Sequence, residues 1–529
     1  MIKKILGLSV FWSIAVVYIA QGQTKKKPVK PICIDMFVAS SQKAFKSRKV
    51  ERYSMWERIE NNCAFNTAEI PTELTSAFEG VSKRSQSHMY SLVKGNVKIS
   101  NQIIAPTERQ FFQSEFLSSG SRSKTFGCLT GMSYKEESFI LSNVNYFKII
   151  IENIEYIQDE LQYKYHVGPR SYSCKIIKKP SDIDSVMNNP LEIGWLLSIA
   201  GGHTLGNFLF IEQAQYRTNE YRNTVMGNID ILKGAKPLRL KTKEYLKVPI
   251  FSISFGNFFQ DGICGKVAQF SLSEEDAFKR QDNIGEDFSD LGKAVVERLL
   301  TRKGGRRILV DVGGISLKAR EWYYKHIRDR RFEKDTIPIL ATNVGISGLS
   351  KKDKNYSNED AKLKNSNAML NHRHANLCKE DVLEVLRSNG LIGISLERDK
   401  LMGKSFQTRY NATVAGSANR RRVAVDAIVS NVCKIIKNCY SIEAWDIISI
   451  GSQFDTHARH LEMYNQSSDM YQLYKDLLLY FRNPRDIEGT FDAKDIKDLM
   501  YDYTPQEIVD KIMYKNALSF VKKHLPKIK

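Results

Sequence analysis

The sequence predicts an α/β protein built as a (β/α)8 barrel of the TIM type, and two observations lead to this prediction. First, residues 308–345 read as one strand–helix–strand unit, in which the apolar runs Ile308–Val312 and Ile337–Ala341 flank a segment with helical periodicity. Continuous apolar strands joined by an amphipathic helix are typical of parallel sheets buried on both faces. Second, at least six strand–helix units follow one another along the chain, which favours a barrel over a doubly wound sheet.

The beginning of the chain predicts a secretory signal peptide over residues 1–22. Met1–Lys4 is a short basic segment, Ile5–Ala20 is apolar, and Gln21–Thr24 ends the apolar run. This order is typical of an export signal. An uncleaved membrane anchor is the alternative, although the apolar run is short for a membrane span. We therefore expect an exported protein that is periplasmic, envelope-associated or secreted.

Residues 23–85 read as an N-terminal extension with no recognisable chemistry. Within it, Met36–Phe45 and Tyr53–Ile59 favour helices. The barrel and its C-terminal helices then occupy residues 86–529, and the first barrel strand is expected within His88–Ile104.

The rest of the barrel alternates between helices and strands. Helices are expected at 136–165, 288–300, 380–388 and 421–437, and strands at 190–203, 248–254, 391–394 and 445–450. The polar segment Lys351–Asn371 reads as an exposed loop. Helices are expected from Asp469 onward, where Thr504 and Pro505 suit a helix start.

The formal net charge of +20 does not by itself identify a function. Lys and Arg are scattered rather than striped with aromatic residues, and the sequence has no nucleic-acid motif, so specific nucleic-acid binding is not expected. A basic surface instead favours electrostatic contact with anionic polymers or membranes.

Eight cysteines are present, and an exported protein can oxidise them. Cys33 with Cys63 and Cys433 with Cys439 are possible disulfide pairs, while buried free thiols explain the residues equally well. A zinc ribbon is excluded because no C-x-x-C pair occurs.

A series of motifs resembles the membrane (renal) dipeptidase family, which are zinc peptidases on a metal-dependent-hydrolase barrel. The string FSDLGKAVVERLLTRKGGRRILVDVGGIS and the following IPILATN are similar to a helix and two strands of that family. The other matching segments are 198–203, 375–383, 450–455 and 503–518. They occur in the family's order over roughly residues 190–525, so the resemblance supports the barrel prediction and implies a peptidase ancestry.

The resemblance also implies where metal ligands would stand, and this chain lacks most of them. The family holds two zinc ions with an H-x-D pair on the first strand, a bridging glutamate and a histidine after each of two later strands. Here the glutamate position is Ala200 and the histidine positions are Gly314 and Asn343. His88 is the nearest candidate for a metal ligand of the first-strand pair. The family also has a histidine that faces the substrate, and its position in this chain is Phe255.

The residues that survive define the predicted site. Asp455 corresponds to the carboxylate that holds the substrate's amino group, and His203, Asn343 and Asn257 are candidate binding residues at strand ends. No metal ligand is assigned. The spacing of Asp455, His457 and His460 could suggest a small metal cluster, although a polar loop is the preferred interpretation.

Three hypotheses remain. The favoured one is an exported, catalytically inactive member of this fold that needs no cofactor and binds or scaffolds a small peptide or an envelope ligand. The second is an active zinc-dependent dipeptidase or other hydrolase that uses substitute ligands such as His203, Asp455 and His457. The third is a basic envelope protein that binds acidic glycans or nucleic acid through charge alone.

Overall fold

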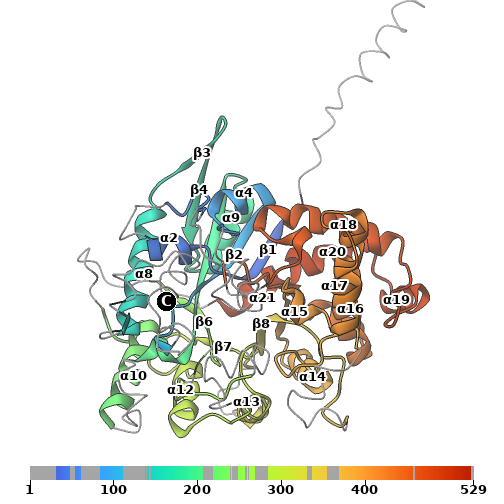
Figure 1. The fold of residues 1–529 in the computed structure, drawn as a ribbon. Helices are drawn as coiled ribbons and strands as arrows, with labels where there is room; N and C mark the ends of the chain where they lie inside the picture. Colours follow the sequence, from blue (N-terminus) through green and yellow to red (C-terminus); the bar gives the residue numbers. More distant parts are fainter. Residues whose placement is uncertain are drawn as a thin grey trace, which may run out of the picture. The chain divides into compact units, whose positions relative to one another are not determined.

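The computed structural model contains a closed barrel of parallel strands surrounded by helices (Figure 1). The structure describes residues 31–47, 54–60, 84–110, 138, 140–141, 145–206, 219–238, 240, 248–256, 259, 261–267, 284–329, 336–353, 368–456 and 459–525. Residues 32–529 form one compact unit. The predicted signal peptide lies outside the described residues. In the described part of the chain, no helix is both long and apolar enough to cross a bilayer.

The ring of strands runs β1, β2, β5, β6, β7, β8, β9, β10 and back to β1. The strands of the ring are β1 (Cys33–Val38), β2 (Val97–Ile104), β5 (Glu192–Ala200), β6 (Ile250–Ser254), β7 (Leu309–Asp311), β8 (Leu340–Val344), β9 (Leu391–Ile394) and β10 (Ile448–Ile450). Every pairing within the ring is parallel. The predicted (β/α)8 barrel is therefore confirmed.

The first strand of the ring was wrongly placed by the sequence analysis. It is β1, in the segment assigned to an N-terminal extension, and it pairs with β2 and β10. The strand expected within His88–Ile104 is present as β2, which is the second strand of the ring and follows a short helix, α4 (Met89–Gly95). Asn96 separates them with a φ of 57°, a left-handed conformation that asparagine tolerates better than most residues.

The antiparallel hairpin of β3 (Tyr165–Val167) and β4 (Arg170–Ile176) extends the sheet outside the ring. β4 pairs with the first half of β5, and β6 pairs with its second half. Both β4 and β6 therefore use the same edge of β5, while β2 occupies the other edge.

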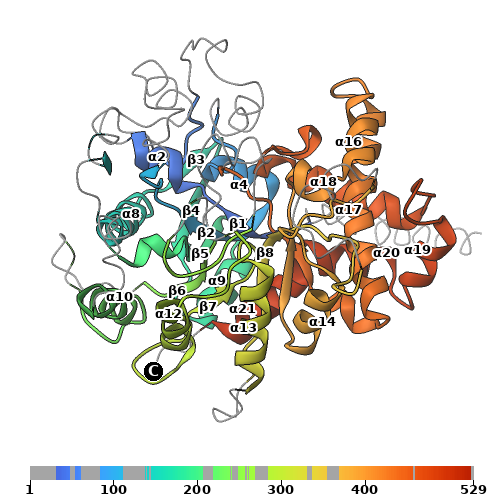
Figure 2. The same ribbon diagram turned by 60° about the horizontal axis from the view of Figure 1, so that its bottom comes forward.

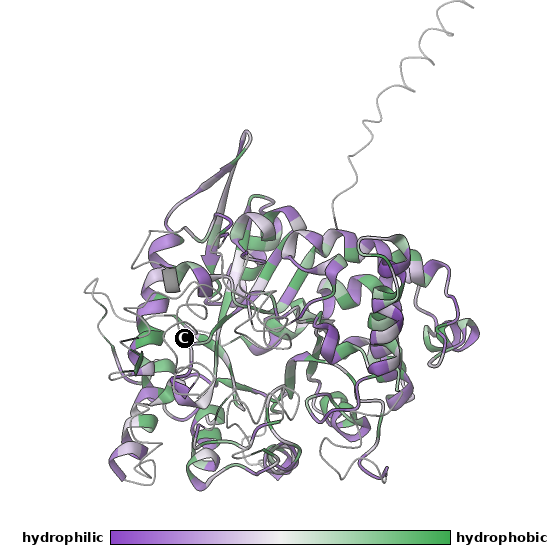
Figure 3. Ribbon diagram, in the orientation of Figure 1, coloured by the Kyte–Doolittle hydropathy of each residue, from purple (hydrophilic) through white to green (hydrophobic). Residues whose placement is uncertain are grey.

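Helices cover the outside of the ring (Figure 2). They are α2 (Ser41–Ser47), α8 (Tyr146–Glu160), α9 (Pro180–Asn188), α10 (Asn219–Leu232), α12 (Asp290–Leu300), α13 (Leu317–Asp329), α14 (Lys379–Arg387), α15 (Arg398–Leu401), α16 (Lys404–Asn411), α17 (Ala418–Cys439), α18 (Met470–Arg482), α19 (Ala493–Leu499), α20 (Pro505–Asp510) and α21 (Asn516–His524). Figure 3 shows that these helices carry both hydrophobic and hydrophilic residues. Such helices bury one stripe against a sheet.

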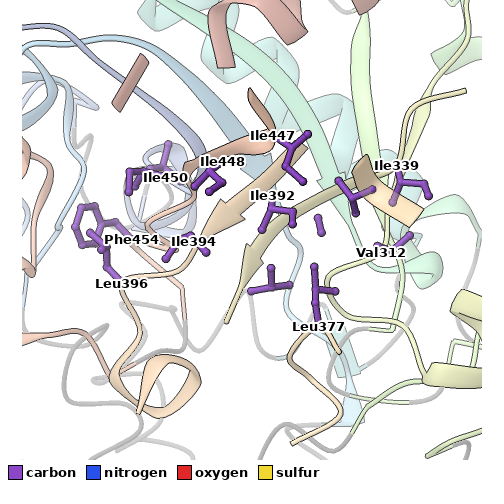
Figure 4. Close-up of a cluster of buried hydrophobic side chains, with 14 of the residues drawn as sticks. Val312, Ile339, Leu377, Ile392, Ile394, Leu396, Ile447, Ile448, Ile450 and Phe454 are labelled. Carbon is purple, nitrogen blue, oxygen red and sulfur yellow. The ribbon is translucent and has the colours of Figure 1, made fainter. Parts of the chain in front are cut away.

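The barrel has an outer and an inner apolar core. The outer core lies between strands and helices; Figure 4 shows part of it, where Ile392, Ile394, Ile448 and Ile450 of adjacent strands gather. The inner core holds the first residues of several strands together with side chains of α21. Its members include Ile34, Ile99, Phe251, Leu309, Leu340, Leu391, Ala517 and Phe520. α21 therefore closes the amino-terminal end of the barrel.

Most predicted elements from residue 190 onward are confirmed within a few residues. One smaller prediction is wrong, because residues 54–60 form turns rather than a helix. The strand expected at 445–450 is confirmed only in its second half: residues 445–447 end a 3-10 turn, η6 (Ile442–Ile447), and residues 448–450 form β10.

Of the two interpretations left open for Cys433 and Cys439, the structure supports free thiols rather than a disulfide, because both are unpaired on α17. Six helical positions correspond to a rise of about 9 Å, beyond the Cα separation that a disulfide spans. Cys33 is a free thiol as well, and Cys63 lies outside the described residues.

Candidate functional site

The carboxyl ends of the barrel strands offer few metal-binding groups. β5 ends at Ala200, Gly314 follows β7, and Asn343 lies in β8; these are the positions where the resemblance implies a glutamate and two histidines. Ala200 packs with Phe37 and Ile103 in a buried apolar cluster. An apolar contact therefore occupies the place where a bridging carboxylate would be needed.

The first strand supplies no histidine either. Among the six residues of β1, CIDMFV, the acidic group is Asp35. Asp35 is fully buried, and its Oδ1 accepts hydrogen bonds from the backbone N–H groups of Phe37 at 3.2 Å and Ser452 at 2.9 Å. Its Oδ2 is buried without a hydrogen-bond partner in the described part of the chain. Burial raises the pKa of Asp35 to about 7.

His88 does not take the role expected for a first-strand ligand. It is the N-cap residue of α4, on no strand, and it is 5% exposed. Its Nδ1 lies 3.4 Å from the hydroxyl of Ser85. Burial lowers the pKa of His88, while the negative charge of Asp455 opposes that shift. We therefore assign His88 to local packing.

The main chain of β8 lies very close to two glycines, one in β9 and one just after β10. A Cβ atom placed on Gly451, just after β10, would lie 1.4 Å from the backbone oxygen of Thr342 in β8. A Cβ on Gly393 of β9 would lie 2.3 Å from the same oxygen. Because contacts below 3.0 Å are not possible for real Cβ atoms, glycine is required at both positions. The β8 main chain thus lies against the backbone at both glycines, and neither position can carry a side chain.

Asp455 is buried and its carboxylate is surrounded by donors. Its Oδ2 accepts hydrogen bonds from the N–H of Ser87 at 2.7 Å and the hydroxyl of Ser87 at 2.6 Å. Its Oδ1 accepts from the N–H of Gln86 at 2.9 Å and lies 3.8 Å from the ammonium of Lys43. The backbone N–H of Asp455 in turn donates to Oε1 of Gln86 at 2.8 Å. Through these contacts the carboxylate joins the loop after β10 to the segment before α4. Both of its oxygens already accept hydrogen bonds, so few acceptor positions remain for a substrate amine.

His203 lies in the 3-10 turn η2 (Gly202–Leu205) after β5, fully buried against the ring of Tyr146 at a centroid distance of 4.6 Å. Its Nε2 is 3.3 Å from the carbonyl oxygen of Pro106. Burial lowers the pKa of His203 to about 4. A carboxylate oxygen of Glu108 lies 3.9 Å from Nδ1, too far for a hydrogen bond, so burial determines the direction of the shift. His203 is therefore a neutral packing residue at pH 7.

A polar cluster above β7 and β8 was missed by the sequence analysis. The Lys400 ammonium donates to the backbone oxygen of Asn343 at 2.7 Å and to Oε1 of Gln453 at 3.0 Å. The carboxylate of Asp311 accepts from the N–H and the hydroxyl of Thr342. Burial raises the pKa of Asp311 and lowers that of Lys400. Lys400 lies in a short helix after β9 that carries no family motif, so no sequence signal pointed to it.

The other predicted site residues do not gather around one point. Asn257 and His457 lie outside the described residues. His460 accepts a hydrogen bond from Nε2 of Gln86 at 3.0 Å. Within the ranges that the structure describes, no three His, Cys, Asp or Glu side chains are grouped closely enough to hold a metal ion. The strand-end residues that the structure describes do not fit a two-zinc centre.

No protein-family model and no curated protein sequence matches the chain. Among solved structures, the chain is similar to dipeptidase AC, a metallopeptidase of family M19, with a TM-score of 0.48 and 8% identity over 94% of this chain and 99% of that one.

Two further structures are similar to the chain. One is the probable dipeptidase PvdM from Pseudomonas aeruginosa, with a TM-score of 0.46 and 12% identity over 94% of this chain and 96% of that one. The other is a metallopeptidase from Rhodobacter sphaeroides liganded with a phosphinate mimic of the dipeptide L-Ala-D-Ala. It has a TM-score of 0.47 and 9% identity over 94% of this chain and 99% of that one.

Proposed function

We propose that this protein is an exported, dipeptidase-like barrel that has lost its metal centre and acts by binding a small peptide or an envelope ligand rather than by hydrolysis. The observation that carries the proposal is the chemistry of three strand ends. Ala200, Gly314 and Asn343 stand where the resemblance implies zinc ligands. Alanine and glycine side chains have no donor atom, and a neutral amide is a poor ligand for zinc.

Two further features support the loss of hydrolysis. The β8 main chain lies where side chains at Gly393 and Gly451 would point, so neither position can carry a metal ligand or a substrate-binding side chain. Asp455, the matched substrate-binding carboxylate, is engaged by Gln86, Ser87 and Lys43. A substrate amine would have to compete with these donors.

The active-hydrolase alternative depends on substitute ligands, and the described residues do not favour it. His203 and Asp455 belong to separate hydrogen-bond networks, one through Pro106 and the other through Gln86 and Ser87. Neither network directs both side chains toward a shared ion. We therefore keep metal-dependent hydrolysis as the outcome that would overturn the proposal.

The test combines metal analysis with an assay of hydrolysis. We expect far less than one zinc per chain in protein purified without chelator, and no turnover of a dipeptide panel with or without added zinc. Stoichiometric zinc together with turnover that is lost in Asp455→Asn, while Asp184→Asn keeps it, would overturn the proposal. Asp184 provides a matched control because it is an exposed carboxylate paired with Lys522 at 2.6 Å.

The charge-only hypothesis makes a different prediction. Binding to acidic polymers through scattered lysines should weaken steeply as salt is added. A peptide or envelope ligand held in a defined site should instead saturate and depend weakly on salt. A titration of the same ligand at two chloride concentrations separates these cases.

A further inference from the structure

A cavity of about 840 Å³ lies between the loops around residues 348 and 370, helices α16 and α17, and the segment 488–491, and no residue of a barrel strand lines it. α16 and α17 lie side by side in both ribbon views (Figures 1 and 2). The volume is within the range of roughly 300–1,000 Å³ that small-molecule sites occupy. The space is therefore sufficient for a metabolite-sized ligand.

The side chains around this cavity carry an excess of positive charge. Lys404, Arg409, Lys434 and Lys437 line it together with one carboxylate, that of Glu488. Arg409 lies 3.9 Å from the Glu488 carboxylate, so this cation already has a counter-ion. Lys437 also has one, the carboxylate of Asp495 at 3.7 Å.

The other two lysines have no such partner in the described part of the chain. Neither Lys404 nor Lys434 lies within 4.0 Å of a carboxylate there, and Lys434 is half-buried on α17. Lys434 and Lys437 are three positions apart on one helix, which brings two like charges together. Burial and Lys437 both lower the pKa of Lys434, while Asp353 opposes that shift. A bound anion would relieve this repulsion.

The cavity also has an apolar wall and hydroxyl groups. Met369, Leu370 and Phe491 line one part of it, and Leu370 and Phe491 are buried. Ser405 and Thr408 of α16 are further lining residues. This combination suits a ligand with an organic body as well as charged groups, because a bare inorganic ion would leave the apolar wall uncovered.

We propose that this cavity binds a small organic anion that carries two or more negative charges, with Lys404 and Lys434 as its main charge partners. A phosphate ester and a di- or tricarboxylate are two sources of the same chemistry. Lysine recognises either as a point charge. Ala200, Gly314 and Asn343 do not line this cavity, so the proposal does not rest on the loss of the metal centre.

The experiment is calorimetric titration of the full chain with phenyl phosphate, citrate and, as a singly charged control, benzoate at constant ionic strength. We expect saturable binding of phenyl phosphate or citrate, and much weaker binding of benzoate. Lys404→Gln and Lys434→Gln should each weaken binding by about tenfold, as expected for the loss of a charge-assisted contact. Lys236→Gln is the matched control, because Lys236 is an exposed lysine that follows α10.

The outcomes separate the sources and test the site. Tighter binding of phenyl phosphate would identify the ligand class as phosphate esters. Tighter binding of citrate would identify it as polycarboxylates. The proposal is overturned if neither anion binds saturably at millimolar concentration, or if Lys236→Gln weakens binding as much as the two cavity variants. Circular dichroism of each variant verifies that it is folded. Because zinc content and dipeptide hydrolysis are measured separately, failure here leaves the proposed loss of hydrolysis standing.

Discussion

Asp455 and Ser87 are joined by two hydrogen bonds although 368 positions separate them in the sequence. Both donors of Ser87, its N–H and its hydroxyl, reach the same carboxylate oxygen at 2.7 and 2.6 Å. Asp455 itself has a φ of 60°, a conformation that aspartate adopts more readily than most side chains. The pair fixes the loop after β10 against the segment that leads into α4.

The first prediction concerns this pair. Asp455→Asn removes the charge and turns an amide NH₂ toward donors, so we expect a loss of roughly 2–4 kcal/mol in the free energy of unfolding. Guanidinium unfolding measures it. Asp184→Asn is the matched control. The wild-type Asp184 carboxylate is exposed, so this variant should lose less than about 1 kcal/mol in the free energy of unfolding. Equal losses in the two variants would show that Asp455 is not a structural anchor.

The barrel could be predicted from sequence because its later strands are short apolar runs followed by helices with apolar stripes. Leu391–Ile394 is such a run, and it is β9 without change. β1 could not be found in the same way. Its sequence, CIDMFV, includes a buried aspartate, and the following helix α2 has only seven residues. The local pattern is that of a mixed segment, and only pairing with β2 and β10 identifies the strand.

The candidate site was less accessible to sequence analysis than the fold. The missing ligands at Ala200 and Gly314 could be identified from motif order alone. The contacts that now engage Asp455 come from Gln86 and Ser87, which the sequence places far away. Likewise, the cavity beside α17 brings together Lys404 and Lys434 from different helices. Such contacts depend on tertiary structure and leave no local pattern.

The second prediction concerns Gly451. In Gly451→Ala the new methyl group would meet the Thr342 carbonyl oxygen at 1.4 Å, so the backbone of β8 or β10 must move. We expect severe destabilisation, on the order of 3 kcal/mol or more, because overpacking against backbone is not relieved by a rotamer change. Thermal unfolding followed by circular dichroism measures the effect.

Gly227→Ala is the control for the same chemical change. Gly227 lies within α10, and its nearest neighbour to a new Cβ atom would be the Lys236 ammonium at 3.7 Å. Alanine in an open helix position should stabilise the protein by about 0.5–1 kcal/mol. If Gly451→Ala behaved like Gly227→Ala, the Thr342 carbonyl could not lie this close to Gly451.

The third prediction uses the buried carboxyl of Asp35. Its pKa of about 7 in the folded state exceeds the ordinary value of 3.8, so the folded state holds a proton that the unfolded state has released. The associated stability is fully present below about pH 4 and is lost as the pH rises to 7. Asp35→Asn keeps an oxygen for the N–H groups of Phe37 and Ser452 and cannot ionise. We expect it to be more stable than wild type at pH 8 by about 1–3 kcal/mol.

The measurement is the free energy of unfolding of Asp35→Asn and of wild type, compared from pH 4 to 8. The difference should grow with pH up to about 7 and then level off. Asp35→Ala is the control, because it removes the acceptor oxygen and should be destabilised throughout the range. A difference that stays constant across the range would contradict the raised pKa.

The last prediction concerns His203, whose titration acts in the opposite direction. Its folded-state pKa of about 4 lies below the ordinary 6.5. Between these two pH values, His203 binds a proton in the unfolded state but not in the folded state. Stability is therefore lost as the pH falls from about 6.5 to 4, by up to roughly 2–3 kcal/mol. His203→Gln cannot take up this proton and should lose less stability over the same interval, even if it is less stable than wild type at pH 7. His326→Gln serves as the control, since His326 is partly exposed and lies 3.0 Å from the Glu297 carboxylate. If acid unfolding midpoints of His203→Gln and His326→Gln shift equally relative to wild type, then the burial of His203 does not govern its protonation.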